Sequence, residues 1–309
     1  MLFATVEARG QENGTLDGWT VAAPEYDHAR IGGLDKAIAD ERFKRINSII
    51  VIRNGELLVE RYYNGAARDQ THNPRSVGKT VAATILGIAI SEGYIDSVDQ
   101  RLDEFYNLTN YENYSEKKAA VTLRQLLTMT SGFEGYDFDP DSIGNEEYMY
   151  PQDNWVRWAL NLPMAEDREP GDEWRYFTAG IVILGDILNT AVPGGLEAYA
   201  DRKLFEPLGV RNYDWQRTPQ RVANTAGGIQ LTPLGFAKFG ELHRDYGRWQ
   251  GLSIVPADWV DSMLQPVVDT TVEGNRYGYL WWHKSYRVDD EDWDVAYCSG
   301  NGGNKIFVF

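Results

Sequence analysis

The two ends of this sequence carry strand signals, and a long middle part separates them. Near the start, the apolar runs 49–52 and 57–63 flank Asn54-Gly55. Asn-Gly between two apolar runs is the strongest short-range signal for a β-hairpin. Near the end, 294–297 and 305–309 are rich in β-branched and aromatic residues, which favour strands. We therefore expect one sheet built from both ends of the chain, with the middle inserted into it.

Helical periodicity dominates the middle of the chain. Val81, Ile85 and Ile88 lie on one face of an expected helix, and Gly93 stands where a C-terminal cap is needed. Further helices are predicted after Thr122, over 181–188, after Thr232-Pro233 and around Trp259, and a strand is predicted over 278–282. The chain is thus expected to be an α/β (α+β) protein: 20–75 and 270–309 form an antiparallel sheet flanked by helices, and 76–269 form a mainly helical region.

Composition narrows the range of partners. The chain has 309 residues, 43% of them hydrophobic, which is enough for a sizeable core. Its net charge of −16 argues against nucleic acid or an anionic membrane surface as partner. No apolar run is long enough to span a membrane, and the start lacks a signal-peptide pattern. Both a cytoplasmic protein and a periplasmic or secreted one whose signal peptide is absent from this chain remain open.

A candidate nucleophile stands where the strand pattern gives way to the helical one. Ser76-Val77-Gly78-Lys79 places a serine and a lysine three residues apart, on one face of a helix start. A serine hydroxyl needs a neighbouring base before it can attack a carbonyl, and a helix N-terminus favours the negative charge that then develops. The alternative is an N-cap serine followed by a solvated lysine.

Two later segments add groups that such a site requires. Tyr176 precedes an apolar helix and can act as a second proton-transfer group, or simply pack there as a half-buried aromatic residue. Residues 299–304, Ser-Gly-Asn-Gly-Gly-Asn, lead into the last strand. Backbone rich in glycine can approach a substrate closely and direct amides at an oxyanion. The same segment also fits a tight hairpin turn.

These motifs, in this order and rough spacing, resemble the class C β-lactamases, the DD-peptidases and their esterase relatives. Three further segments resemble the same family: 126–132 (Leu-Leu-Thr-Met-Thr-Ser-Gly), 226–233 (Ala-Gly-Gly-Ile-Gln-Leu-Thr-Pro) and 277–282 (Tyr-Gly-Tyr-Leu-Trp-Trp). The resemblance runs from about Ile49 to Phe309. It implies a β-lactamase-like, penicillin-recognising fold with the active site between the sheet and the helical region. It also implies that a further strand and a closing helix follow Phe309.

The resemblance assigns roles to residues. Ser76 is the nucleophile, and Lys79 and Tyr176 share proton transfer as a coupled pair, so that either can be the base. The amide of Ser76 and one from Gly303-Asn304 are expected to form the oxyanion hole. Two positions depart from the family pattern. Thr178 stands where relatives carry the asparagine of Tyr-x-Asn, and Asn301-Gly302-Gly303 stands where they carry Lys-Thr-Gly.

The function implied is that of a serine hydrolase acting through an acyl-enzyme on small carboxylic esters or amides. A β-lactamase or D-Ala-D-Ala peptidase, and a non-catalytic recognition module, are the alternatives. Since Asn301 supplies no cation for a carboxylate, we expect β-lactams to be poor substrates. The segment 133–158, which begins at Phe133, is rich in aromatic and acidic residues. It is expected either to wall a substrate pocket or to hold a long loop down.

No cofactor and no metal are implied, because the four histidines are scattered along the chain and no zinc motif occurs. The expected partner is a small-molecule ester or amide substrate, and the oligomeric state is left open. Asn301, Gly302, Gly303, Asn304, Thr178 and Phe133 are the residues expected around the substrate. Ser76, Lys79 and Tyr176 are those expected to carry the chemistry.

Overall fold

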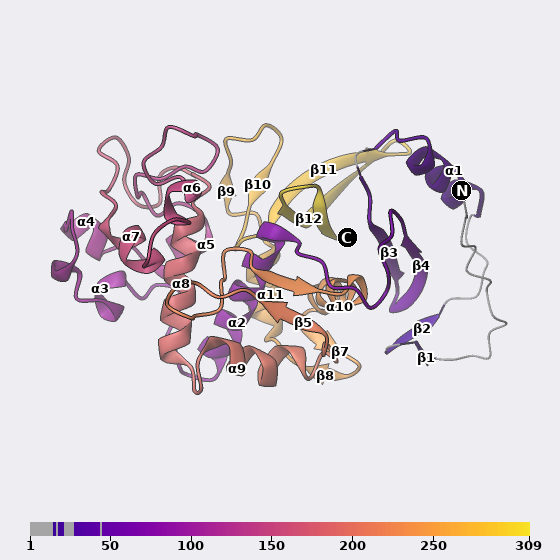
Figure 1. Ribbon diagram of the computed structural model, residues 1–309, viewed down its shortest axis with the longest axis horizontal. Helices are drawn as coiled ribbons and strands as arrows, with labels where there is room; N and C mark the ends of the chain where they lie inside the picture. Colours follow the sequence, from indigo (N-terminus) through magenta and orange to yellow (C-terminus); the bar gives the residue numbers. More distant parts are fainter. Residues whose placement is uncertain (1–14, 17, 22–27, 44) are drawn as a thin grey trace. The chain divides into compact units, whose positions relative to one another are not determined.

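A computed structural model describes residues 15–16, 18–21, 28–43 and 45–309 (Figure 1). The chain divides into two compact units, residues 1–70 and residues 71–309. The candidate residues from Ser76 onward all belong to the second unit, so the site is built within it.

The first unit is a small four-stranded sheet with one helix. The sheet has the order β1-β2-β4-β3, in which β2 and β4 are parallel and the other pairs antiparallel. Asn54 and Gly55 both have positive φ, 53° and 77°, which is the geometry of the hairpin turn predicted between β3 and β4. The elements are β1 (Thr15–Leu16), β2 (Trp19–Val21), α1 (His28–Ala39), β3 (Ser48–Arg53) and β4 (Glu56–Tyr62).

Helices occupy most of the second unit. In α2 every residue from Lys79 to Ala89 is buried, so this helix lies in the core of the unit. Helix α8 is also largely buried and packs on α2, α5 and α7. The elements are η1 (Arg75–Gly78), α2 (Lys79–Ser91), α3 (Leu102–Phe105), η2 (Leu108–Asn110), α4 (Glu116–Ala119), α5 (Leu123–Leu127), α6 (Glu146–Met149), α7 (Trp155–Asn161), α8 (Thr178–Ala191), α9 (Leu196–Ala200), η3 (Asp201–Phe205), α10 (Pro233–Arg244) and α11 (Ala257–Leu264).

The second unit also contains a five-stranded antiparallel sheet of order β13-β12-β11-β10-β9. Helix α10 packs against β13, and η1 lies beside β12 and β13, so the start of α2 meets the end of β12 (Figure 1). The strands are β5 (Tyr213–Trp215), β6 (Ile229–Leu231), β7 (Arg248–Trp249), β8 (Leu252–Ser253), β9 (Val268–Asp269), β10 (Arg276–Tyr277), β11 (Trp282–Val288), β12 (Glu291–Gly300) and β13 (Asn304–Val308).

The predicted helix caps are confirmed. Thr122 accepts a hydrogen bond from the Gln125 amide at the start of α5, and Thr232 accepts one from the Gly235 amide at the start of α10. Gly93 follows α2 with φ 76°, as its capping role requires. The strand predicted over 278–282 is wrong. That segment turns instead: the Gly278 amide bonds to the Trp281 carbonyl, and β11 begins only at Trp282.

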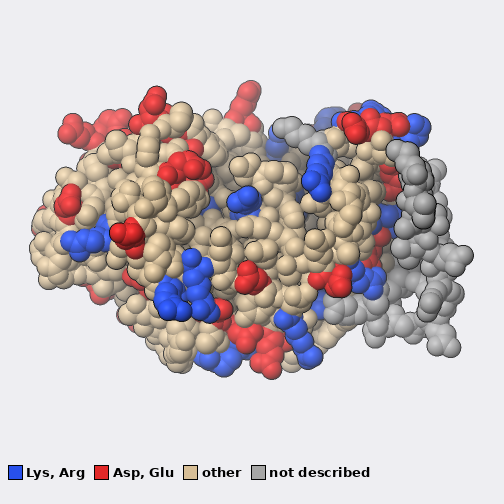
Figure 2. Space-filling view, viewed as in Figure 1, with Lys and Arg blue, Asp and Glu red and all other residues tan. Residues whose placement is uncertain are grey.

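The predicted boundary at 75/76 lies near the division between the two units, whereas 270–309 lies in the second unit together with 76–269. Each unit has its own sheet, and the joining of both ends of the chain into one sheet stays a prediction. On the face that Figure 2 shows, Lys and Arg side chains of the described residues are dispersed among Asp and Glu. Within the described part of the chain, no single helix is long and apolar enough to cross a membrane, and only α8 with Leu196–Phe205, bent by 78°, passes on length and composition.

Candidate active site

Ser76 lies in a single helical turn that leads directly into α2. The preceding residue, Arg75, has φ 58°, a conformation that is uncommon for a residue with a side chain. Its amide donates to the Asn73 side chain at 2.8 Å, which stabilises the turn. Ser76 is partly exposed, although α2, which begins three residues later, is buried from Lys79 to Ala89. At such a position the backbone amides have no partner within the helix.

Lys79 brings its amine to the serine as the sequence predicts. Its Nζ donates to Ser76 Oγ at 2.9 Å and to the Ala226 carbonyl at 2.5 Å. Only 1% of Lys79 is exposed, and no carboxylate forms an ion pair with it among the described residues. A lysine held this way has a hydroxyl, rather than an acid, as its polar side-chain partner. The predicted pair is therefore brought together, with the geometry of a proton transfer between hydroxyl and amine.

Tyr176 completes the predicted group of three. The Nζ of Lys79 lies 5.2 Å from the centroid of the Tyr176 ring. This ring stacks on Phe138 at 5.2 Å and on Trp282 at 6.0 Å between centroids, so packing fixes its plane. Within the described part of the chain, the phenol oxygen makes no side-chain hydrogen bond. It is thus left available for a group that enters the site.

Glycines from two distant segments pack against the nucleophile turn. A Cβ on Gly227 would lie 2.9 Å from the Arg75 carbonyl, and the φ of Gly227 is 148°. A Cβ on Gly300 would overlap the Pro74 carbonyl and lie 3.2 Å from the Ser76 nitrogen. Both positions therefore require glycine, because backbone meets backbone there. This contact brings the end of β12 to the Ser76 amide.

Strand β12 approaches the nucleophile turn at Gly300, and not at the Gly303-Asn304 pair that was expected to supply an oxyanion amide. The sequence pointed to Gly303-Asn304, yet a Cβ on Gly303 would meet nothing within 4 Å. Gly302 and Gly303 have φ of 87° and 89°, and the Gly303 amide bonds to the Gly300 carbonyl at 3.3 Å. These two glycines form the tight turn between β12 and β13, which was the alternative interpretation. Their positive φ accounts for them without any ligand.

The two asparagines of this turn, Asn301 and Asn304, differ in their side-chain contacts and exposure. The Asn304 side chain donates to the Asn301 carbonyl at 2.8 Å and contacts His72 Nε2 at 2.7 Å. It is therefore occupied within the protein. Asn301 directly follows Gly300 and is exposed. Its amide is the next one along the chain from the backbone that touches Ser76.

Two other predicted residues turn out to be buried. Thr178 is the first residue of α8 and is fully buried, and its amide donates to Asp137 Oδ2 at 2.7 Å. Phe133 is only 2% exposed and stacks on Phe177 at 5.5 Å. Phe133 therefore anchors the start of the aromatic segment in the core. Phe138 of the same segment is 51% exposed and covers Tyr176, so the segment both packs and contributes an open apolar surface.

The segment 126–132 holds the backbone on both sides of Tyr176. The carbonyl of Met129 accepts from the Arg175 amide at 2.8 Å, and its sulfur accepts from the Phe177 amide at 3.3 Å. Met129 itself has φ 58°. The residues on either side of Tyr176 are thus fixed by a single methionine.

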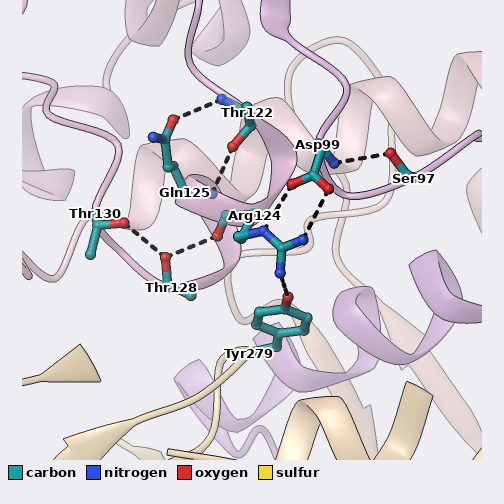
Figure 3. Close-up of polar contacts among 8 residues, drawn as sticks. All are labelled: Ser97, Asp99, Thr122, Arg124, Gln125, Thr128, Thr130 and Tyr279. Carbon is teal, nitrogen blue, oxygen red and sulfur yellow. Dashed lines mark hydrogen bonds and ion pairs between the residues drawn. The ribbon is translucent and has the colours of Figure 1, made fainter. Parts of the chain in front are cut away.

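Helix α5, which precedes Met129, is anchored by a polar network (Figure 3). The Arg124 guanidinium pairs with Asp99 at 2.9 Å and also donates to the Tyr279 hydroxyl. The Leu280 amide bonds to the Leu127 carbonyl at 3.1 Å. Since Tyr279 and Leu280 come just before Trp282, this network ties α5 to the strand whose tryptophan stacks on Tyr176.

Sequence reasoning missed Asp137, which contacts the backbone on both sides of Phe177. Burial raises the pKa of the Asp137 carboxyl to about 6. Nothing in its spacing singles it out, since it lies in a segment full of acids. Phe138 and Trp282 lie in two segments singled out from the sequence, 133–158 and 277–282. Their stacking on Tyr176 was not predicted. Among the described residues, no group of three or more His, Cys, Asp or Glu is placed to hold a metal ion.

A serine, a lysine and a tyrosine thus lie together at the starts of two buried helices, next to the end of β12. Comparison with known proteins identifies the class of protein that has this arrangement. The sequence model of the beta-lactamase family matches residues 38–291. The chain belongs to the beta-lactamase family.

Curated relatives are distant. The chain is 25% identical over 241 residues to 6-aminohexanoate-dimer hydrolase of Paenarthrobacter ureafaciens, covering 71% of this chain and 57% of that protein. It is 22% identical over 197 residues to Protein flp of Staphylococcus aureus strain NCTC 8325, covering 60% of this chain and 37% of that protein. The match therefore spans little more than half of one relative and about a third of the other.

Solved structures share the fold. EstCE1, described as a hydrolase with promiscuous acyltransferase activity, superposes with a TM-score of 0.71 at 16% identity, covering 90% of this chain and 89% of that one. A penicillin binding protein from Bacillus halodurans superposes with a TM-score of 0.65 at 16% identity, covering 89% and 93%. The β-lactamase-like fold of helices and antiparallel sheets, expected from the motifs, is confirmed.

Proposed function

We propose that this protein is a serine hydrolase that forms an acyl-enzyme on Ser76 with small carboxylic esters or amides. The contact that carries the proposal is the 2.9 Å hydrogen bond from Lys79 Nζ to Ser76 Oγ. In an isolated helix start this lysine would be solvated. Here it is buried against the hydroxyl, and its second partner is only a carbonyl. Such placement supports activation of a weak nucleophile by an adjacent base.

The reaction proposed has two halves. Ser76 Oγ bonds to the substrate carbonyl carbon, and its proton passes to the coupled pair of Lys79 and Tyr176. The tetrahedral oxyanion accepts hydrogen bonds from the Ser76 amide and from the Asn301 amide. Collapse breaks the bond to the alcohol or amine, which takes up the proton. Water then attacks the acyl-enzyme, and its proton follows the same path before the carboxylic acid leaves.

The contact of Gly300 with the nucleophile turn supports Asn301 rather than Gly303-Asn304 as the source of the second amide. The relatives support the range of substrates: one is named 6-aminohexanoate-dimer hydrolase, and one is described as a hydrolase with promiscuous acyltransferase activity. Exposed Phe138, stacked on Tyr176, supports a preference for an apolar group next to the scissile bond. β-Lactamase and D-Ala-D-Ala peptidase activity are the alternatives.

Charge near the turn supports esters and linear amides over β-lactams. Asn301 is uncharged, and Lys305 on the neighbouring strand is engaged with the Ser299 hydroxyl. A β-lactam carboxylate would have to recruit that lysine. A charge-assisted hydrogen bond is worth about 1.5–3 kcal/mol, so its absence costs roughly 10- to 150-fold in affinity. A neutral ester loses nothing by it.

Ser76→Ala tests the proposal. We expect turnover of a nitrophenyl ester to fall by about 10³-fold or more, because removal of a nucleophile removes the covalent path. Ser91→Ala, at the other end of α2, is the matched control and should keep wild-type activity. A serine-reactive phosphonate should label the peptide that contains Ser76. If wild-type protein binds a penicillin yet is neither labelled nor active, the non-catalytic recognition module is the correct interpretation.

A further inference from the structure

Asp137 links three parts of the second unit around the backbone of Tyr176. Its amide donates to the Tyr176 carbonyl at 2.8 Å. Its Oδ2 accepts from the Thr178 amide at 2.7 Å, and its Oδ1 accepts from the Glu146 amide at 2.8 Å. One residue therefore holds the chain just after the tyrosine and also the first residue of α8.

These contacts constrain the ring as well as the backbone. The next residue, Phe138, stacks on the Tyr176 ring with an interplanar angle of 9°. A shift of Asp137 would therefore move the backbone of Tyr176 and the ring that covers it together. Met129 also holds the residues before and after Tyr176, but among the described residues it makes no hydrogen bond to the tyrosine's own carbonyl. That contact comes from Asp137.

The carboxylate form suits this position better than the acid form. An ionised carboxylate offers two acceptor oxygens, and two backbone amides use them, one of them at the start of the 14-residue helix α8. Protonation turns one oxygen into a donor that faces an amide N–H. One of the two contacts is then weakened.

The groups that face Asp137 are few and can be named. Lys79 of α2 lowers its pKa, and Glu146 of α6 raises it. Tyr150, just after α6, is close enough for Asp137 to raise the tyrosine's own pKa. Burial has the largest effect and brings the pKa of Asp137 to about 6. The protonation change thus falls in a range where such hydrolases can be assayed.

We propose that Asp137 is a positioning residue for Tyr176, whose ionised carboxylate keeps the phenol beside Lys79. The inference rests on the proposed function, since it concerns the same proton-transfer pair. Asp137 does not touch the reacting atoms. Its protonation is expected to lower kcat with little change in KM, because substrate binding does not use it.

Asp137→Asn tests the inference, because the amide has one acceptor oxygen where the carboxylate has two. We expect kcat for a nitrophenyl ester to fall about tenfold or more at pH 7.5, with KM changed by less than about threefold. In wild-type protein, kcat should fall as the pH drops through about 6, and Asp137→Asn should lack this step. Asp141→Asn, an exposed acid of the same segment, should behave as wild type.

Tyr176→Phe keeps the test valid if Asp137→Asn does not fold. Without the phenol there is nothing for Asp137 to position, so the residual kcat of Tyr176→Phe should show no step near pH 6. A step of wild-type size in either variant would overturn the inference, as would a kcat within twofold of wild type in folded Asp137→Asn. Failure of the proposed function would look different, since wild-type protein would then not be labelled at Ser76.

Discussion

Two lysines in the second unit are buried to nearly the same degree and have different partners. Lys79 at the start of α2 is 1% exposed, and Lys118 in α4 is 0% exposed. Lys118 donates to the carbonyls of Glu112 and Leu160 at 3.0 Å and 2.8 Å. Lys79 donates to one carbonyl and to the hydroxyl of Ser76. Burial and carbonyl partners are thus common to both, and the hydroxyl is what distinguishes Lys79.

The surroundings of the two lysines extend the comparison. Each ammonium lies near an aromatic ring that stacks on a second ring: Tyr176 with Phe138 near Lys79, and Phe133 with Phe177 near Lys118. The pair near Lys118 is closed, because Phe133 and Phe177 are 2% and 3% exposed. The pair near Lys79 opens to solvent through Phe138. The same local construction therefore serves packing in one place and an accessible site in the other.

Replacing each lysine by methionine should separate the two roles. Lys79→Met is expected to lower kcat by about 10²- to 10⁴-fold, since a proton-transfer group is lost. Lys118→Met should leave kcat within about twofold and lower the free energy of unfolding by about 1–3 kcal/mol, because two buried carbonyls lose their donor. Steady-state kinetics on a nitrophenyl ester and urea unfolding of both variants provide the measurement.

Comparable losses of activity in both folded variants would break the comparison, because Lys118 makes no contact with the proposed nucleophile. So would a Lys79→Met variant with near-normal kcat. Tyr176 would then have to act as base alone. Phosphonate labelling of Ser76 in each variant shows whether the nucleophile itself is still activated.

The sequence predicted the fold where local signals were strong. Asn54-Gly55 fixed a hairpin, and Thr122 and Thr232 marked helix starts, because each acts through hydrogen bonds or dihedral angles within a few residues. The segment at Gly278 was mistaken for a strand. Its apolar residues are buried, as they would be in a strand, but the chain turns there and the Gly278 amide bonds to the Trp281 carbonyl.

The part of the site that lies within one short sequence motif could be predicted. Ser76 and Lys79 share a helix start, so their contact follows from sequence spacing. Gly300 and Asp137 could not be found this way. Gly300 is one of three glycines within residues 300–303, and only the packing of β12 on η1 shows which of them touches the nucleophile turn. Asp137 is one acid among many, and its role depends on contacts with α6 and α8.

The pH dependence of stability should distinguish Lys118 further. Burial lowers the pKa of Lys118 to about 8, against an ordinary value of 10.5. Between these two values the unfolded chain binds more protons than the folded one, so the free energy of unfolding rises with pH in this window. The gain is at most about 3 kcal/mol for a shift of this size. Urea unfolding from pH 7 to pH 10.5 measures it.

Lys118→Met provides the reference for that experiment, because tyrosines also titrate toward the upper end of the range. The difference in slope between wild type and Lys118→Met belongs to Lys118 alone. Parallel slopes would mean that Lys118 is solvated in the folded protein. Lys118 and Lys79 would then differ in burial as well, and the hydroxyl partner would no longer be the feature that distinguishes them.

The smallest expected effect concerns the two ring pairs. Phe138 is 51% exposed and Ile143, in the same segment, is 52% exposed, so their alanine variants form a matched pair. Phe138→Ala should lower kcat/KM for a long-chain or aromatic ester by about tenfold, which is the effect of losing about 1.4 kcal/mol of apolar contact. The same variant should change kcat/KM for an acetate ester by less than about threefold, since an acetyl group is too small to use the ring.

Phe133 supplies the opposite expectation for the closed ring pair. Phe133→Ala should lower the free energy of unfolding by about 3–5 kcal/mol, because a buried ring is removed, and should leave the ratio of the two kcat/KM values unchanged. Ile143→Ala should alter neither quantity by a measurable amount. If Phe138→Ala and Ile143→Ala shift the ester preference equally, the exposed ring does not contact substrate. The exposure of Phe138 beside Lys79 would then have no role in substrate binding, and the ester preference would have to come from other residues around Ser76.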